Sequence, residues 1–167
     1  MAEALIGLGG NLGDVRRTID CAVELVCAGN AVRLVGQSAD YRTPPWGLTD
    51  QPAFINRCLE VDTILTPQNL LERALAVERQ LGRDRTNERR WGPRPIDIDL
   101  LSYDDVVLDE PGLRLPHPEL FRRAFVLVPL AEIAADRIVA GTRIGDALAR
   151  LDIAGIERLP PADRFQH

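Results

Sequence analysis

The sequence predicts an α+β fold: a ferredoxin-like βαββαβ sandwich with an antiparallel sheet, helices on one face and a small C-terminal extension. Two segments, 14–27 and 66–81, place apolar residues at helical spacing. One extended segment precedes the first helix, two lie between the helices and one follows the second. A chain of 167 residues without an internal repeat suits one domain, which we expect to span residues 1–158.

The N-terminal part predicts a strand, a helix and a second strand. The apolar run Ala4–Leu8 predicts the first strand, and a glycine-rich turn follows it. Asp14 is a good N-cap for a helix that ends near Cys27. The apolar stripe of this helix consists of Val15, Ile19, Ala22, Val23 and Val26. Residues 31–42 predict the second strand.

The glycines in GLGGNLGD (7–14) resemble those of a dinucleotide-binding loop. In the GxGxxG pattern the last position is glycine, but Leu12 stands there in this chain. The order of elements also predicts no parallel βαβ sheet. We therefore interpret the segment as a tight turn into a helix, with backbone amides that could face an anion.

The middle of the chain predicts a third strand and a second helix. The stretch TPPWGLTDQP (43–52) cannot be regular structure, because its prolines fix φ and remove N–H donors. Residues 53–63 predict the third strand. A Thr-Pro pair at 66–67 begins the second helix, which runs to about Leu81.

A long polar loop, 83–95, leads into the fourth strand at Ile96–Leu101. The C-terminal part predicts a small hairpin at 106–115, then a loop around His117 and two shorter helices. We expect residues 159–167 to be a frayed tail. A functional site should lie on the sheet face away from the helices, surrounded by loops 9–14, 43–52 and 83–95.

Composition and charge exclude several classes of chemistry. All twenty basic residues are arginine, which excludes a Walker A lysine, a lysine Schiff base and a Ser-Lys dyad. The net charge of −5 argues against a general nucleic-acid or membrane coat. No run of about 18 apolar residues is present, and the N-terminus carries no basic segment. Three cysteines without CxxC spacing predict free thiols, so we expect a cytoplasmic protein.

Asp97 and Asp99 give the strongest chemical signal. They alternate with Ile96 and Ile98 on the fourth strand, so both carboxylates lie on one face, about 6.6 Å apart along the strand. Two partly buried like charges repel, and a divalent cation removes that conflict. Mg²⁺ commonly takes one or two carboxylates together with substrate phosphates. The alternative is a polar sheet edge that faces solvent.

Five arginines precede this strand within twelve residues: Arg83, Arg85, Arg89, Arg90 and Arg94. Arg94 lies between two prolines, which suits a fixed guanidinium fork on phosphate oxygens. Carboxylates, a metal and several arginines are the typical groups of phosphoryl transfer, which needs positioning and charge neutralisation. Arg83 and Arg85, farther from the strand, suit a lid over a bound nucleotide. A solvated loop is the simpler alternative.

Other candidates carry weaker signals. Phe54 and Asn56 share a face of the third strand, where a ring can stack on a flat heterocycle and an amide can read its edge. Core packing of Phe54 explains the pattern equally well. His117 is a single loop histidine, a residue that is usually structural. Glu78 falls on the apolar stripe of the second helix and therefore needs a partner.

The run RWGPRPIDIDLL (90–101) resembles the signature of the 6-hydroxymethyl-7,8-dihydropterin pyrophosphokinase family. Further segments agree in the same order: GGNLGD (9–14), YRTPPWG (41–47), DQPAFIN (50–56), GRDR (82–85) and LPHPELFRRAFVLVPL (115–130). The resemblance covers about residues 4–135. It implies a compact ferredoxin-like sandwich that transfers the β,γ-pyrophosphoryl group of ATP to the pterin hydroxymethyl oxygen and releases AMP, in folate biosynthesis.

The resemblance also implies roles for particular residues. Asp97 and Asp99 match the pair that holds two Mg²⁺ ions on the triphosphate. Together with these two, the catalytic residues are expected to be Arg83, Arg85 and Arg94. The nucleotide is expected to contact Glu78, Arg85, Arg94, the backbone near Ile98, His117 and Arg123.

The pterin is expected to lie between Phe54 and Phe125. Asn56 should read its edge, and Thr43 and Pro45 should contact it through the backbone. The sequence departs from the family pattern at Leu75, where a polar nucleotide contact can occur, and at Pro118, where an aromatic is also seen. The arginine loop is one residue longer than in some members, which shifts the register of Arg89 and Arg90.

Three other functions share some of these sequence features. A ferredoxin-like RNA-binding module should carry an aromatic-rich central strand and a basic face, whereas this chain is acidic and has 5% aromatics. A small-molecule regulatory domain has no need for the Asp pair. A nucleotide-sugar transferase also uses Asp-x-Asp, usually with a larger domain. We expect a monomer that binds ATP and the pterin, and neither nucleic acid nor membrane.

Overall fold

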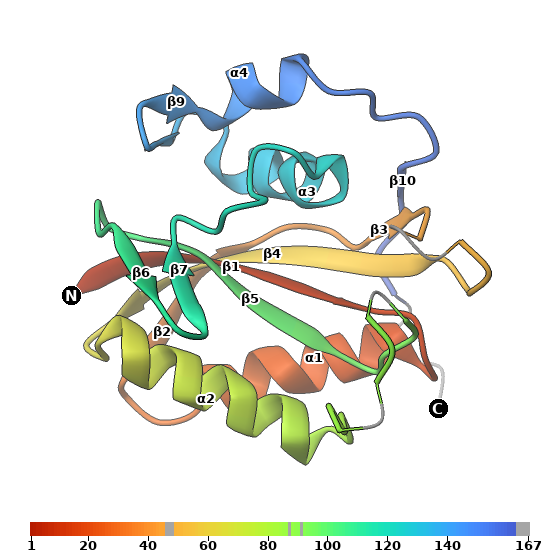
Figure 1. Cartoon of the computed structure of the whole chain (residues 1–167), viewed down its shortest axis with the longest axis horizontal. Helices are drawn as coiled ribbons and strands as arrows, with labels where there is room; N and C mark the ends of the chain where they lie inside the picture. The colour runs from red at the N-terminus through yellow and green to blue at the C-terminus, as the bar shows by residue number, and fades with distance from the viewer. Residues whose placement is uncertain (46–48, 87, 91, 163–167) are drawn as a thin grey trace.

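The computed structural model describes residues 1–45, 49–86, 88–90 and 92–162. In this part of the chain, six strands form an antiparallel sheet that lies between two layers of helices (Figure 1). The sheet contains β1 (Ala2–Gly10), β2 (Val32–Gln37), β3 (Tyr41–Thr43), β4 (Phe54–Thr63), β5 (Asp97–Tyr103) and β10 (Glu157–Arg158). The helices are α1 (Val15–Val26), α2 (Pro67–Gln80), α3 (Ala124–Ala134) and α4 (Ile144–Ala149). Two hairpins complete the fold, β6 (Leu108–Glu110) with β7 (Leu113–Leu115) and β8 (Ile138–Val139) with β9 (Thr142–Arg143).

The two predicted helices form as expected. Asp14 caps α1 by accepting the Arg17 backbone N–H, and Thr66 caps α2 by accepting the Asn69 N–H. Figure 1 shows both helices side by side under one face of the sheet. Their apolar stripes pack on the inward side chains of the central strands. This core includes Ile6, Leu8, Ile19, Leu59, Leu70, Ile96 and Ile98.

The single strand predicted at 31–42 is wrong, because the chain forms two strands there. β2 pairs with the Leu59–Thr63 end of β4, whereas β3 pairs with the Phe54–Asn56 end. Between them the chain leaves the sheet at Ser38, whose N–H donates to the Cys58 carbonyl. The βαββαβ order is retained if β2 and β3 are counted together as its second strand.

β1 continues further than predicted, through Gly10. Gly9 pairs with Asn56 on one side and Asp97 on the other, so Gly7, Gly9 and Gly10 belong to the sheet, whereas Gly13, with a φ of 74°, lies in the turn before α1. A side chain at Gly10 would place its Cβ 2.4 Å from the Pro95 carbonyl oxygen. The backbones of β1 and the segment before β5 can approach this closely only with glycine at this position.

The second face of the sheet is partly covered, which the expectation of helices on one face did not include. Figure 1 shows α3 and α4 stacked on the side opposite α1 and α2. A second core joins α3 to this face, with Leu5, Cys58, Leu101, Leu127 and Leu130 among its members. The uncovered remainder of the face lies beside the beginning of α3.

The C-terminal segment packs beyond the expected boundary at residue 158. β10 pairs with β3, and Leu159 is buried with its N–H donating to the Asp40 carbonyl. The described chain ends at residue 162, so most of the tail expected to fray lies outside it. No helix among the described residues is long and apolar enough to span a membrane.

Candidate active site

A cavity of about 290 Å³ lies on the uncovered part of the second sheet face, beside the beginning of α3. It collects side chains from the central strands, from α3 and from the loop before β5, as the sequence predicted. The predicted residues that line it are Thr43, Phe54, Asn56, Arg83, Arg85, Arg94, Asp97, Asp99, His117, Arg123 and Phe125. Pro45 does not line the cavity; its neighbour Pro44 does. Trp46 and Trp91, which belong to quoted family motifs, lie outside the described residues.

A second, more apolar cavity of about 820 Å³ opens between α2, β5 and the β6–β7 hairpin. Its floor is apolar, formed by Leu71, Leu75, Ile98, Leu100 and Leu113. Pro118 also lines it, so both predicted departures from the family pattern belong to this cavity. The two cavities share Arg85, Asp99 and His117, which stand where they meet.

The two aspartates project from β5 into the first cavity. In the register of the sheet Asp97 lies beside Gly9 and Asp99 beside Gly7, so the neighbouring strand places no side chain next to either carboxylate. A Cβ at Gly9 would lie 2.3 Å from Oδ1 of Asn56. These glycines are functional residues that the sequence analysis missed, although two glycines at i and i+2 of a strand indicate a bare sheet face.

The charge of Asp99 is poorly compensated. Burial and the neighbouring negative charge of Asp97 raise the pKa of Asp99 to about 8. Among the described residues, no group of three or more His, Cys, Asp or Glu side chains could hold a metal ion without other ligands. The two carboxylates supply only part of the six oxygen ligands of Mg²⁺, so a cation held there would take its other ligands from water and substrate oxygens.

Asp99→Asn should raise the stability of the metal-free protein at about pH 8. A carboxyl with a raised folded-state pKa binds its proton more tightly when folded, so the free energy of unfolding falls as pH rises from 3.8 to about 8. Asparagine removes this loss. We expect a gain of about 1 kcal/mol or more, which is roughly 2–4 °C in the midpoint of thermal unfolding.

Calorimetry with a chelator present measures this midpoint, and the exposed Asp105→Asn is the matched control. The gain should shrink as pH falls toward 4, where the carboxyl is protonated in the folded state and about half protonated in the unfolded state. An Asp99→Asn variant that is less stable than wild type at both pH values would contradict the assignment of an uncompensated charge.

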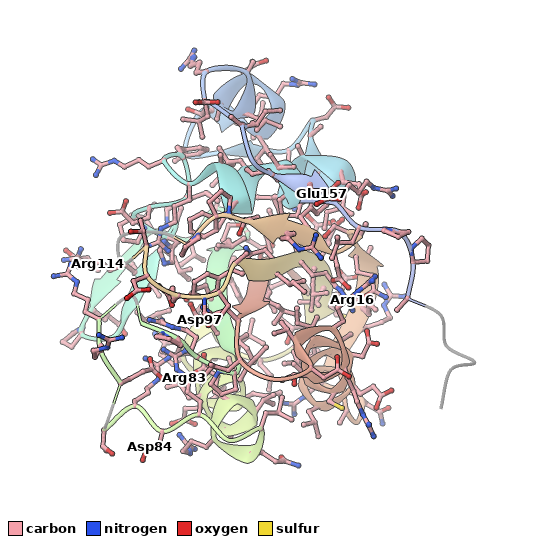
Figure 2. All side chains as sticks on the ribbon, turned by 90° about the vertical axis from the view of Figure 1, so that its right-hand side faces the viewer. Arg16, Arg83, Asp84, Asp97, Arg114 and Glu157 are labelled. Carbon is pink, nitrogen blue, oxygen red and sulfur yellow. The ribbon has the colours of Figure 1, made fainter. Side chains whose placement is uncertain are left out.

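Arg83 is buried, in contrast to the exposed lid position that we expected. Its side chain is only 3% exposed, because it forms ion pairs with Glu78, Glu88 and Asp97. Burial alone would lower its pKa, but these carboxylates raise it, so the guanidinium stays charged. Figure 2 shows Arg83 and Asp97 close together, where the loop meets β5.

Arg85 and Arg94 line the first cavity and form fewer ion pairs with the protein than Arg83 does. Arg85 is 55% exposed and donates from Nη2 to Oε1 of Glu78 at 2.7 Å. Nη1 of Arg94 lies 3.8 Å from Oδ2 of Asp97, and its backbone N–H donates to Oδ1 of Asn11. Arg85 therefore lies where the two cavities meet, and Arg94 lies beside Asp97 in the first cavity.

Glu78 lines neither cavity. Its carboxylate is buried, and Oε2 accepts the backbone N–H of Ile98 at 2.8 Å and Nη1 of Arg83 at 3.0 Å. Oε1 is taken by Arg85. The sequence predicted that this buried carboxylate needs a partner. The structure supplies three, which are the guanidinium groups of Arg83 and Arg85 and the backbone N–H of Ile98. A direct contact of Glu78 with the nucleotide stays a prediction.

The far end of the first cavity carries groups suited to a flat ligand. Nδ2 of Asn56 donates to Oγ1 of Thr43 at 2.8 Å, which fixes the plane of the amide. The guanidinium of Arg123 lies 5.6 Å from the centre of the Phe125 ring. The buried Nε of Arg123 has no hydrogen-bond partner among the described residues.

His117 is neutral near pH 7, because burial and the positive charge of Arg123 lower its pKa. Its Nδ1 accepts the backbone N–H of Glu119 at 3.1 Å. In a neutral ring the proton then resides on Nε2, which can donate to a ligand. His117 is therefore a hydrogen-bond donor where the two cavities meet.

Comparison with known proteins shows the family of this chain. Residues 5–135 match the family model described as 7,8-dihydro-6-hydroxymethylpterin-pyrophosphokinase (HPPK). The chain belongs to this family. Two bacterial relatives are named 2-amino-4-hydroxy-6-hydroxymethyldihydropteridine pyrophosphokinase. The protein of Methylorubrum extorquens is 52% identical over 95% of this chain and 99% of its own length, and that of Pseudomonas aeruginosa is 41% identical over 94% and 96%.

Solved structures support the HPPK fold. The crystal structure of a Plasmodium falciparum HPPK-DHPS triple mutant with STZ-DHP has a TM-score of 0.71 over 89% of this chain at 13% identity. An HPPK-DHPS in complex with substrates has a TM-score of 0.68 at 12% identity. This chain spans 43% of each of those longer chains. The ferredoxin-like α+β prediction is thereby confirmed, and the chain is an enzyme of the HPPK family.

Two arginines of the loop before β5, whose register the family resemblance left open, lie apart from the cavities. Arg89 and Arg90 line neither of them, and the Arg89 carbonyl accepts the N–H of Gly92. Glu88, which was not among the predicted site residues, joins the site through Arg83. Its spacing of five residues from Arg83 gives no helical or strand pattern that could have revealed the contact.

Proposed function

We propose that this chain transfers the β,γ-pyrophosphoryl group of ATP to the hydroxymethyl oxygen of 6-hydroxymethyl-7,8-dihydropterin, in the presence of Mg²⁺ and as a step of folate biosynthesis. The observation that carries the proposal is the meeting of two different cavities at Asp99 and His117. One cavity suits a flat, polar-edged ring and the other an adenosine group. Their junction carries the charges that phosphoryl transfer needs.

The first cavity is the proposed pterin site. Phe54 and Phe125 supply aromatic faces, and Asn56 supplies both a donor and an acceptor to the edge of a heterocycle. An RNA-binding module would carry aromatic side chains on both central strands, whereas in this chain only β4 contributes one, Phe54. Here β1 has Gly7 and Gly9 on that face, which leaves room for a small ligand.

The second cavity is the proposed nucleotide site. Its apolar floor, including Leu75 and Ile98, suits the faces of adenine. From this site a triphosphate chain can extend to the junction, where the Nε2–H of His117 and the guanidinium of Arg85 are available. Arg94 and Arg123 continue the positive surface into the first cavity.

The residues at the junction position the reacting groups. The pterin hydroxyl oxygen attacks the β-phosphorus, the bond from that phosphorus to the α,β-bridging oxygen breaks, and AMP leaves while the hydroxyl proton is released. Asp97 and Asp99 would hold Mg²⁺, two ions as the family resemblance implies, which neutralises phosphate charge and lowers the pKa of the hydroxyl. Arg85, Arg94 and Arg123 stabilise the charge on the transferred oxygens.

The direct test mixes the protein with ATP, Mg²⁺ and the reduced hydroxymethyl pterin and identifies the nucleotide product by chromatography. AMP together with the pterin diphosphate supports the proposal. ADP as the product, or no turnover, would contradict it. A chelator should stop the reaction, and added Mg²⁺ should restore it.

Arg85→Ala should lower kcat by about 10²-fold or more while leaving pterin affinity nearly unchanged. The arginine stands at the junction, so its charge acts on the transferred group and not on the pterin ring. Steady-state rates and a fluorescence titration with pterin separate the two effects. Arg79→Ala, an exposed arginine in the last turn of α2, is the control. A variant that loses pterin affinity but keeps kcat would remove Arg85 from this role.

We further propose that the chain works as a monomer in the cytoplasm, with residues 1–158 as its single catalytic domain. The two cavities adjoin and share Arg85, Asp99 and His117, which supports a site built within one domain. Light scattering during size-exclusion chromatography tests the monomer. A dimer at assay concentration would contradict it.

A further inference from the structure

Arg83 is almost wholly occupied by protein acceptors. Nε and Nη2 donate to the two oxygens of Glu88 at 2.9 and 2.6 Å. Nη1 contacts Oε2 of Glu78 at 3.0 Å, the Ile96 carbonyl at 3.2 Å and Oδ1 of Asp97 at 2.9 Å. A guanidinium has five N–H groups, so at most one of them remains for a substrate. Its contacts suit a support for Asp97 better than a clamp on phosphate.

Glu88 determines the orientation of this support. Two parallel hydrogen bonds from Nε and Nη2 to one carboxylate fix the plane of a guanidinium. With the plane fixed, Nη1 is directed at Oδ1 of Asp97. Oδ2 of the same aspartate then faces Arg94, 3.8 Å away, in the cavity. Glu88 thereby controls which oxygen of Asp97 the protein uses and which it leaves for a cation.

The negative charge of Glu88 also favours cation binding at Asp97. Glu88 is mostly buried beside Arg83, so the positive charge of the guanidinium is shared among three carboxylates. Without the charge of Glu88, Arg83 would attract Asp97 more strongly and compete with a divalent cation for it. The negative potential that attracts the cation would also fall. Both effects weaken cation binding and leave the pterin end of the cavity unchanged.

We propose that Glu88 is a positioning residue for the metal-binding carboxylate of Asp97 and that it acts through Arg83. The inference rests on the proposed function, because it assigns Asp97 to the cation of that reaction. Groups that orient a metal ligand typically contribute about 10–100-fold to metal affinity or activity. Glu88→Gln keeps the shape of the side chain and removes its charge, so it tests the contribution of the carboxylate to cation binding at Asp97.

The experiment measures the rate of AMP formation against free Mg²⁺ at saturating ATP and pterin. We expect Glu88→Gln to raise the Mg²⁺ concentration for half-maximal rate by about 10–100-fold. Pterin affinity, measured by fluorescence, should stay within about twofold. Glu72→Gln, the same change at an exposed position of α2, should match wild type. An unchanged Mg²⁺ dependence for Glu88→Gln, or an equal loss of Mg²⁺ and pterin affinity, would overturn the proposal.

A second pair of variants tests whether Glu88 acts through Arg83. Arg83→Lys keeps the charge but cannot form the fork, so it should raise the Mg²⁺ requirement to a similar extent. Adding Glu88→Gln to it should raise that requirement by less than the product of the two single losses, because the fork is already lost and only the charge of Glu88 remains to be removed. If the two losses multiply, Glu88 does not act through Arg83. Wild-type protein that forms no AMP would overturn the proposed function instead, which keeps the two failures distinct.

Discussion

Asp97→Asn and Asp99→Asn should each lower kcat by about 10³-fold or more, because a metal that neutralises phosphate charge contributes several kcal/mol to the transition state. Asparagine keeps the size of the side chain and one carbonyl oxygen, so each variant should still fold. Asp97→Asn leaves Arg83 paired with Glu78 and Glu88. Asp99→Asn removes the charge that burial and Asp97 oppose.

The measurement is AMP formation at saturating substrates and Mg²⁺, with circular dichroism to establish the fold. Asp105→Asn, at an exposed position, should keep wild-type rates. Asp99→Asn should thus be both more stable without metal and nearly inactive, a combination that a purely structural carboxylate cannot produce. A rate within about tenfold of wild type in either variant would remove that aspartate from the metal site.

The parity of β5 explains why the placement of Asp97 and Asp99 on one sheet face was predictable from sequence. Alternation places Ile98 and Leu100 in the core under the sheet and Asp97 and Asp99 on the other face, whatever the rest of the fold does. Helix caps at Asp14 and Thr66 were predictable for the same reason, because they depend on residues a few positions apart.

Contacts between distant segments were not predictable. The break between β2 and β3 depends on which end of β4 each strand pairs with, and local propensity does not encode that choice. The burial of Arg83 depends on Glu78 from α2 and Asp97 from β5 meeting around one loop residue. A charged loop has the same composition whether it is solvated or folded inward, so composition alone favoured the exposed lid.

Glu78→Ala should lower the free energy of unfolding by about 3–5 kcal/mol, the typical cost of removing one partner from a buried ion pair. Glu78 is 1% exposed and accepts the N–H of Ile98, which would be left unpaired next to the aspartate strand. Arg83 would keep Glu88 and Asp97, so the protein should still fold. The midpoint of thermal unfolding should fall by about 10 °C.

Glu78→Gln separates the structural role from a contact with nucleotide. Its amide oxygen can still accept the N–H of Ile98, so most of the stability should return, while the charge that holds Arg83 and Arg85 is lost. Glu72→Ala on the same helix should change stability by less than about 0.5 kcal/mol. If Glu78→Ala loses less than about 1 kcal/mol and instead raises the KM for ATP, the carboxylate binds nucleotide and does not anchor the arginines.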